Sequence, residues 1–185
     1  TQQPKYYYFA WSNRLILYYL KNGRTNIALY EAQKMLKEAQ EEDDKTGLSR
    51  CYNIMSQIYT VKRLDSMAFE WQLKEIELTE KYDLENYNIS QTYSQISSYY
   101  INTNQPEKAL EALKKADATA YSPTQKISVQ LEYVNYYSKF GDMQAAEKIL
   151  NECKTAFDQD KRLWSIKKRL YNIESVSYTH LRAHE

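Results

Sequence analysis

Histidine is missing from residues 1–175, because both histidines of this chain stand within its last ten positions. Without histidine, this region lacks the commonest general acid–base of enzymes and the commonest nitrogen ligand of metal sites. Glycine is also scarce, with three copies that are isolated from one another, so that no glycine-rich phosphate-binding loop can be built. The sequence therefore predicts no catalytic, cofactor or metal site, and hence no enzyme.

The sequence also has few cysteines, no marked excess of either charge and no long apolar runs. Cys51 and Cys153 are too few for a disulfide framework, and two small buried apolar residues are the favoured interpretation. Lysine and arginine number 25 against 24 aspartates and glutamates, which gives no electrostatic reason to expect nucleic acid as a partner. No apolar run approaches the ~20 residues of a membrane-spanning helix. We therefore expect neither nucleic-acid binding nor a membrane span in this stretch of sequence.

Two charged clusters leave alternatives open. Residues 41–44 are all acidic and could hold a hard cation, but they lack the spacing of a calcium loop, so that a solvated helix end is favoured. Basic residues between 161 and 169 could contact nucleic acid. Because Leu163 and Leu170 are spaced among them at a helical period, the charged outer face of an amphipathic helix is favoured.

The last ten residues, 176–185, differ in style from everything before them. Residue for residue, they resemble the in-frame translation of a transposase-type DNA sequencing adapter. We therefore predict that this tail is not native and that the natural protein continues beyond Ser175. The chain begins at Thr1 without a methionine, so that sequence before it is also expected to be missing.

A register of tyrosine and alanine runs through residues 5–175. Tyrosines recur at spacings of 40, 41, 37 and 34 residues, and an alanine stands nine residues after each of the first four. Four residues after the tyrosine comes a turn residue. Apolar residues within each unit recur at the three-and-four spacing of a helix. The register predicts helix–turn–helix units; its members are Tyr19, Tyr59, Tyr100, Tyr137 and Tyr171, then Ala28, Ala68, Ala109 and Ala146, then Gly23, Arg63, Asn104 and Gly141.

Helix starts are marked by proline and aspartate. Pro106 and Pro123 suit the first turn of a helix, where a missing N–H is harmless. Asp142 follows Gly141 and is expected to cap the next helix. The alanines are small enough to let the two helices of a hairpin approach closely. No strand alternation competes with this interpretation.

The register resembles the tetratricopeptide repeat (TPR) family. The best unit, residues 93–116, has an aromatic residue, a small residue, a tyrosine and a pair of alanines in the family's order. Gln72 and Glu75 depart from the pattern, because small or apolar residues are expected there. The resemblance implies an all-α fold, a right-handed α-solenoid of stacked hairpins. It would form one domain over 1–175, with repeats near 5–44, 45–82, 83–120, 121–158 and 159–175, followed by the tail at 176–185.

In this family the first helix of each hairpin lines the concave side, where a protein or peptide ligand is expected. The candidate residues are rich in amides and hydroxyls, which hydrogen-bond a peptide backbone without demanding a charge. The family's clamp for a C-terminal carboxylate also needs lysines at set places, and this sequence does not have them there. A merely solvated helix face is an equal alternative for each candidate. The candidates are Asn13, Leu17, Arg50, Asn53, Gln57, Gln91, Ser94, Ser98, Leu131, Asn135, Arg162 and Arg169.

The resemblance implies a non-catalytic protein- or peptide-binding scaffold module, part of a longer protein. Long, tyrosine-rich, glycine-poor repeats also resemble those that precede a membrane span and a histidine kinase in sensor proteins of Bacteroidetes. That resemblance implies a signal-transduction role and a periplasmic location. The regulatory region of a transcription factor is a further alternative, and a cytoplasmic location would suit it and the scaffold. The oligomeric state is not indicated.

Overall fold

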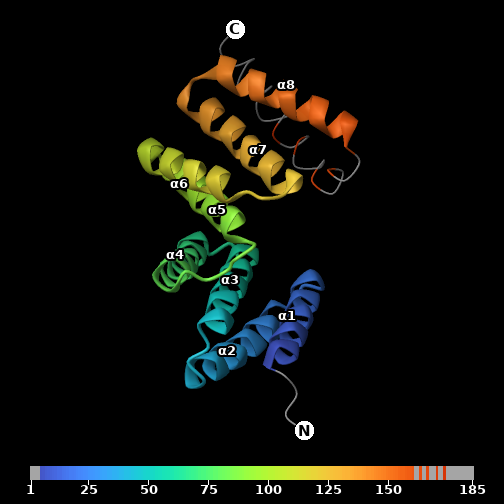
Figure 1. Ribbon diagram of the computed structural model, residues 1–185, viewed down its shortest axis with the longest axis vertical. Coiled ribbons are helices and arrows are strands. Elements are labelled where there is room, and N and C mark those ends of the chain that lie inside the picture. Colours follow the sequence, from blue (N-terminus) through green and yellow to red (C-terminus); the bar gives the residue numbers. More distant parts are fainter. Residues whose placement is uncertain (1–4, 161–162, 164–165, 167–169, 171–172, 174–185) are drawn as a thin grey trace. The chain divides into compact units, whose positions relative to one another are not determined.

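The computed structural model describes residues 5–160 together with 163, 166, 170 and 173, and it describes side chains from residue 12 onward. In this part of the chain, all the regular structure is helical. Eight α-helices follow one another there, separated by short turns (Figure 1). The expectation of an all-helical fold is confirmed. The helices are α1 (Lys5–Lys21), α2 (Thr25–Glu41), α3 (Lys45–Val61), α4 (Asp65–Tyr82), α5 (Ile89–Asn102), α6 (Pro106–Thr119), α7 (Pro123–Phe140) and α8 (Met143–Gln159).

The first helix of each hairpin ends in the same way, and the repeated tyrosine takes part. In each case the residue five positions after the tyrosine donates its backbone N–H to the tyrosine carbonyl, at 2.8–3.0 Å. The intervening residue adopts a left-handed conformation, with φ of 72° at Gly23, 57° at Arg63, 58° at Asn104 and 94° at Gly141. This geometry satisfies carbonyls that would otherwise be orphaned at a helix end. The turn residues of the register therefore lie at the C-terminal ends of α1, α3, α5 and α7.

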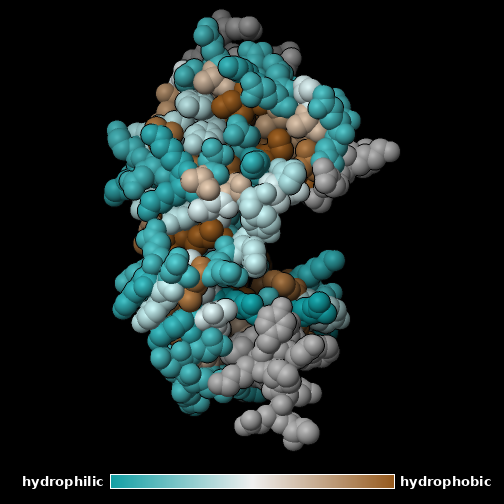
Figure 2. Space-filling model, viewed as in Figure 1, coloured by the Kyte–Doolittle hydropathy of each residue, from teal (hydrophilic) through white to brown (hydrophobic). Residues whose placement is uncertain are grey.

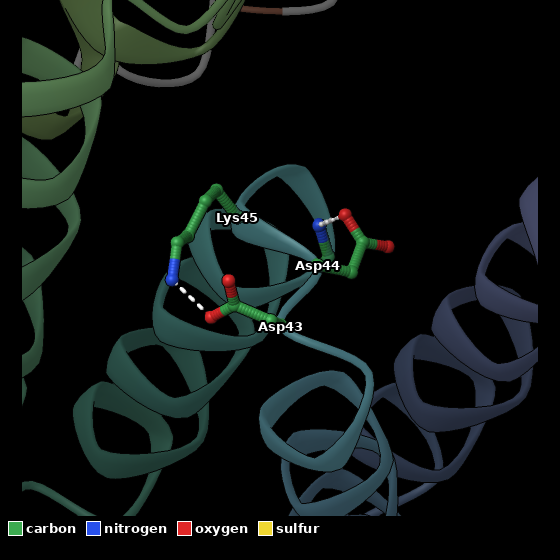
Figure 3. Close-up of polar contacts among 4 residues, drawn as sticks. Asp43, Asp44 and Lys45 are labelled. Atoms are coloured by element: carbon green, nitrogen blue, oxygen red, sulfur yellow. Dashed lines mark hydrogen bonds and ion pairs between the residues drawn. The ribbon is translucent and has the colours of Figure 1, made fainter.

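Helix starts are capped by side chains, as the sequence suggested. Asp142 accepts a hydrogen bond from the backbone N–H of Ala145 at 3.0 Å. Asp44 accepts one from Gly47 at 3.0 Å, and the neighbouring Asp43 pairs with Lys45 (Figure 3). Both prolines, at 106 and 123, lie in the first turn of a helix. Asp43 and Asp44, from the acidic run at 41–44, thus lie at the start of α3 and stabilise it.

The chain divides into two compact units, residues 1–86 and residues 87–185. In the first unit, α1 packs on α2, α2 packs on α3 and α3 packs on α4, and α1 also contacts α3. In the second unit, α5 packs on α6, and α7 packs on both of them and on α8. Each unit is thus built from sequential helical hairpins rather than from helices around a single centre. Hydrophilic side chains cover most of the visible face of the described residues, with smaller hydrophobic patches between them (Figure 2).

The core of each unit lies between its helices and includes the alanines of the register. Ala28, Ala109 and Ala146 are 0% exposed and Ala68 is 4% exposed. Larger apolar side chains complete the packing: Ile16, Met35, Ile54 and Ile58 in the first unit, and Leu131, Val134, Phe157, Leu163 and Leu170 in the second. Small residues at the crossing points let neighbouring helix backbones approach, and the apolar side chains on either side fill the space.

Replacing Ala109 with leucine is expected to destabilise the second unit by about 1–3 kcal/mol, because the added methyl groups have no room. Ala109 is fully buried on α6, and the Ser97 hydroxyl of α5 reaches its carbonyl oxygen at 3.0 Å. Urea unfolding measures the effect. Glu111→Leu, at an exposed position on the same helix, is the matched control. Equal stability of the two variants would contradict the close approach of α5 and α6 at Ala109.

Candidate functional site: a cavity between α5 and α7

The second unit contains a cavity of about 400 Å³ lined by α5, α7 and Ile166. This volume lies within the range of roughly 300–1,000 Å³ that is usual for ligand sites. Most of the residues that line it are serine, threonine or glutamine, and both helices are the first members of their hairpins (Figure 1). The described residues that line the cavity are Ser90, Gln91, Ser94, Gln95, Ser98, Thr124, Gln125, Ser128, Glu132 and Ile166.

The helical period explains why this space is open. On α5, Ser90, Ser94 and Ser98 follow one another at intervals of four residues, so that they form one stripe along the helix. On α7, three residues at the same interval of four form a second stripe. Serine and threonine side chains are short, so that two such stripes leave space between packed helices where larger residues would fill it. The second stripe consists of Thr124, Ser128 and Glu132.

The serine hydroxyls of α5 already use their hydrogens within the protein. Ser90 donates to the carbonyl oxygen of Ala116 at 2.8 Å, and Ser94 donates to the carbonyl oxygen of Ser90 at 3.0 Å. Ser98 donates to the Oε2 atom of Glu132 at 2.9 Å. A hydroxyl has one hydrogen and two lone pairs, so that the capacity left on these three serines is that of acceptors.

Glu132 is a buried carboxylate at the edge of this cavity. Its side chain is 4% exposed, and its Oε2 atom accepts hydrogen bonds from Ser98 and from the Asn135 amide, the latter at 3.2 Å. Burial of a carboxylate is costly unless polar partners surround it. The two donors come from α5 and from the next turn of α7, and they hold the carboxylate in one orientation beside the cavity.

The first unit holds a second buried carboxylate, Glu75 of α4, which is 1% exposed. Asn86 donates to its Oε1 atom at 2.8 Å, and Asn53 of α3 donates to both carboxylate oxygens at 3.1 and 3.3 Å. Gln57 in turn donates to the side-chain oxygen of Asn53 at 2.7 Å. This polar network occupies the place where the repeat pattern calls for a small or apolar residue.

The structure separates the predicted groove residues into distinct environments. Gln91, Ser94 and Ser98 line the α5–α7 cavity together. Three others are bound into the buried carboxylate networks: Asn53 and Gln57 belong to the network of Glu75, and Asn135 belongs to that of Glu132.

The other candidates are not among the described residues that line the cavity. Leu131 is 0% exposed and packs in the core of the second unit, which corrects its expected place on a groove surface, because α7 is covered by three other helices. On α1, Leu17 is 40% exposed, and the buried Oδ1 atom of Asn13 has no hydrogen-bond partner among the described residues. Arg50 is half-buried on α3. The two remaining candidates, Arg162 and Arg169, lie outside the described residues. The tail at 176–185 also lies outside them.

Sequence reasoning missed the α7 side of the cavity. Thr124, Ser128 and Glu132 recur every four residues, and that spacing is the signal that identifies them as one face. No group of three or more histidine, cysteine, aspartate or glutamate side chains in the described part of the chain is placed to hold a metal ion. None of the described helices is long and apolar enough to span a membrane.

Comparison with known proteins supports the helical-repeat architecture. A protein-family model described as 26S proteasome subunit RPN7 matches residues 60–185. The crystal structure of a Podosopora anserina putative kinesin light chain with nearly identical TPR-like repeats matches with a TM-score of 0.66 and 14% sequence identity, covering 96% of this chain and 99% of that chain. A variant of that protein with one glutamine replaced by methionine gives a TM-score of 0.63 and 14% identity, covering 91% of this chain and 95% of that chain. No curated protein sequence matches. The structural matches confirm a fold of helices packed pairwise as in TPR-like repeats.

Proposed function

The chain belongs to the family of the 26S proteasome subunit RPN7, and on that premise we propose that it is a protein-binding scaffold module without catalytic activity of its own. The family is named for a subunit of a larger assembly, and the structural relative is named as a putative light chain of kinesin. Both names describe components that act alongside other polypeptides. Repeats of paired helices suit that role because they display extended surfaces for binding.

The observation that carries the proposal is the cavity between α5 and α7. A peptide backbone presents one N–H and one carbonyl at most residues, and a surface that binds it needs both acceptors and donors. The serines supply acceptor lone pairs, and Gln91 supplies an amide with both functions. We propose that a segment of the partner protein lies in this cavity, with its backbone hydrogen-bonded to these groups.

The resemblance to sensor regions of Bacteroidetes histidine kinases stays a prediction, as do the regulatory-region alternative and the location that each implies. A protein-binding module would serve any of these proteins, so that the α5–α7 cavity does not discriminate between them. The complete gene would do so. A membrane span and a kinase domain would favour the sensor, and a DNA-binding domain would favour the transcription factor.

Filling the cavity is expected to weaken peptide binding at least tenfold, which corresponds to about 1.4 kcal/mol. Peptides would first be selected from a random library displayed on phage, and their affinity for the purified chain measured by calorimetry. Gln91→Trp places a large ring at the lining of the cavity, from an exposed position on α5. Gln144→Trp makes the same change at an exposed position on α8 and is expected to leave the affinity unchanged.

Two results would count against the proposal. One is a library that yields no peptide above background. The other is a selected peptide that binds Gln91→Trp as tightly as it binds the unaltered chain, since that peptide would not occupy the cavity.

A further inference from the structure

Two exposed tyrosines stand where the chain enters α5 and α7. Tyr87 lies two residues before α5 and Tyr121 lies two residues before α7, and each is 65% exposed. Their ring centroids are 5.7 Å apart, in an edge-to-face arrangement with 67° between the ring planes. We propose that this tyrosine pair binds a proline of the peptide whose backbone lies in the α5–α7 cavity. The inference rests on the proposed function, because it names a residue that the peptide in that cavity carries.

Gln125 connects the tyrosine pair with the cavity. Its side chain is part of the cavity lining. Its Nε2 atom donates to the backbone carbonyl of Tyr87 at 2.7 Å, and its Oε1 atom accepts from the backbone N–H of Tyr121 at 3.2 Å. The first lining residue of each helix, Ser90 or Thr124, comes three positions after the tyrosine. The pair therefore lies at the end of the cavity where α5 and α7 begin, and a peptide that leaves the cavity at this end meets the two rings.

The exposed rings offer apolar surface that the folded chain leaves in water. Removing such surface from water is favourable, and an aromatic ring supplies a large area of it. Tyrosine is enriched at protein interfaces, where its ring is covered by the partner. Because Gln125 holds the backbone of both tyrosines and the rings contact each other, little ordering of the pair remains to be done when a ligand arrives.

Proline fits this pair better than other residues because it brings no backbone N–H. Gln125 already bonds to the Tyr87 carbonyl and the Tyr121 N–H, so that these two loops present chiefly aromatic surface to a ligand. A residue with an N–H group would have to move that donor out of water against the rings, which costs free energy unless it finds an acceptor. Proline has no such donor, its ring packs against aromatic faces, and its fixed φ lowers the entropy lost on binding.

Proline is expected to be enriched at one position among the peptides that the full chain selects from the random phage library. A selected peptide and an analogue with alanine in place of that proline are then titrated into the chain by calorimetry. We expect the proline peptide to bind roughly fivefold more tightly than the alanine analogue, because the analogue loses the contact with the rings.

Tyr121→Ser removes one ring and is expected to bring the ratio of the two affinities close to one. Because Gln125 bonds to backbone atoms of both tyrosines, the variant keeps these hydrogen bonds, and an exposed position tolerates serine without loss of the fold. Tyr121→Phe keeps the ring and should keep the ratio. Tyr30→Ser, at a 66% exposed position on α2 in the other unit, is the matched control and should also keep it.

The outcomes separate this inference from the proposed function. Selected peptides without an enriched proline, whose affinity falls with Gln91→Trp but not with Tyr121→Ser, would overturn the proline inference and keep the peptide-binding cavity. Peptides that lose affinity with Tyr121→Ser but not with Gln91→Trp would bind the tyrosine pair outside the cavity. That result would overturn the proposed function and with it the continuous site. A library that yields no peptide would overturn both.

Discussion

Replacing Glu75 with alanine is expected to lower the free energy of unfolding by about 2–5 kcal/mol, as seen in urea unfolding followed by tryptophan fluorescence. The repeat pattern favours a small residue at this position, so that the family resemblance alone would suggest no cost. The structure gives the opposite expectation, because Asn53 and Asn86 both donate to this carboxylate. Each buried donor that loses its partner costs about 1–3 kcal/mol, and the space that the side chain leaves adds to the loss.

Two further variants show whether the hydrogen bonds are responsible. In Glu75→Gln one oxygen remains, and Oε1 is the atom that accepts from both asparagines, so that a smaller loss is expected. Glu77→Ala changes an exposed glutamate on the same helix and should be nearly neutral. Replacing buried charges with apolar groups stabilises some proteins. If Glu75→Ala is as stable as Glu77→Ala, the network is tolerated by the fold and does not support it.

The parts of the fold that sequence predicts well are those governed by local chemistry. The left-handed turn residues, the prolines at 106 and 123 and the Asp142 cap each act within a few residues of their own position. Their signal is therefore contained in a short stretch of sequence. The alanines of the register are predictable for a similar reason, because their spacing from the repeated tyrosine is constant and all four are buried.

The candidate site was predicted less completely because its partners are distant in sequence. Ser98 and Glu132 lie 34 positions apart, and Asn53 and Glu75 lie 22 apart. A polar residue that pairs across helices looks, in the sequence alone, like a residue on a solvated face. Hence Asn53 and Asn135 were assigned to a groove, whereas the structure shows them holding buried carboxylates.

Leu131 shows a second reason why the sequence alone did not predict the site completely: other helices cover α7 on several sides. The helical period places a residue on one face of α7 but does not say which faces are exposed. Because α5, α6 and α8 all pack on α7, Leu131 and Glu132 are both buried although they are adjacent in sequence. Glu132, the last residue of the polar stripe on α7 that lines the cavity, directly follows the buried Leu131 in the sequence.

Above pH 9 the unaltered chain is expected to lose stability faster than a Cys51→Ala variant. Burial raises the pKa of the Cys51 thiol from 9.0 to about 12, and the nearby carboxylates of Asp44 and Glu38 add to the rise. The thiol is therefore favoured in the folded state and the thiolate in the unfolded state. Its contribution to stability is fully present below pH 9 and is lost as the pH rises toward 12, by about 1.4 kcal/mol for each pH unit.

The measurement is the difference between the unfolding free energies of the two proteins, determined in urea at several pH values from 8 to 11. Alanine leaves a cavity, so that the variant starts out less stable, but only the change of the difference with pH reports the thiol. Tyrosines far from position 51 contribute equally to both proteins and cancel in this difference, whereas Tyr52 does not, because its pKa is raised by burial and by the neighbouring Cys51. Cys153→Ala is the parallel case in the second unit, because burial raises the pKa of that thiol to about 11. Because the pKa of Cys153 lies closer to 9.0 than that of Cys51, the loss of stability from its ionisation should level off about one pH unit earlier.

A difference that stays constant from pH 8 to 11 would mean that the Cys51 thiol reaches solvent in the folded protein. The packing of α3 against its neighbours around that thiol would then be looser than the structure shows.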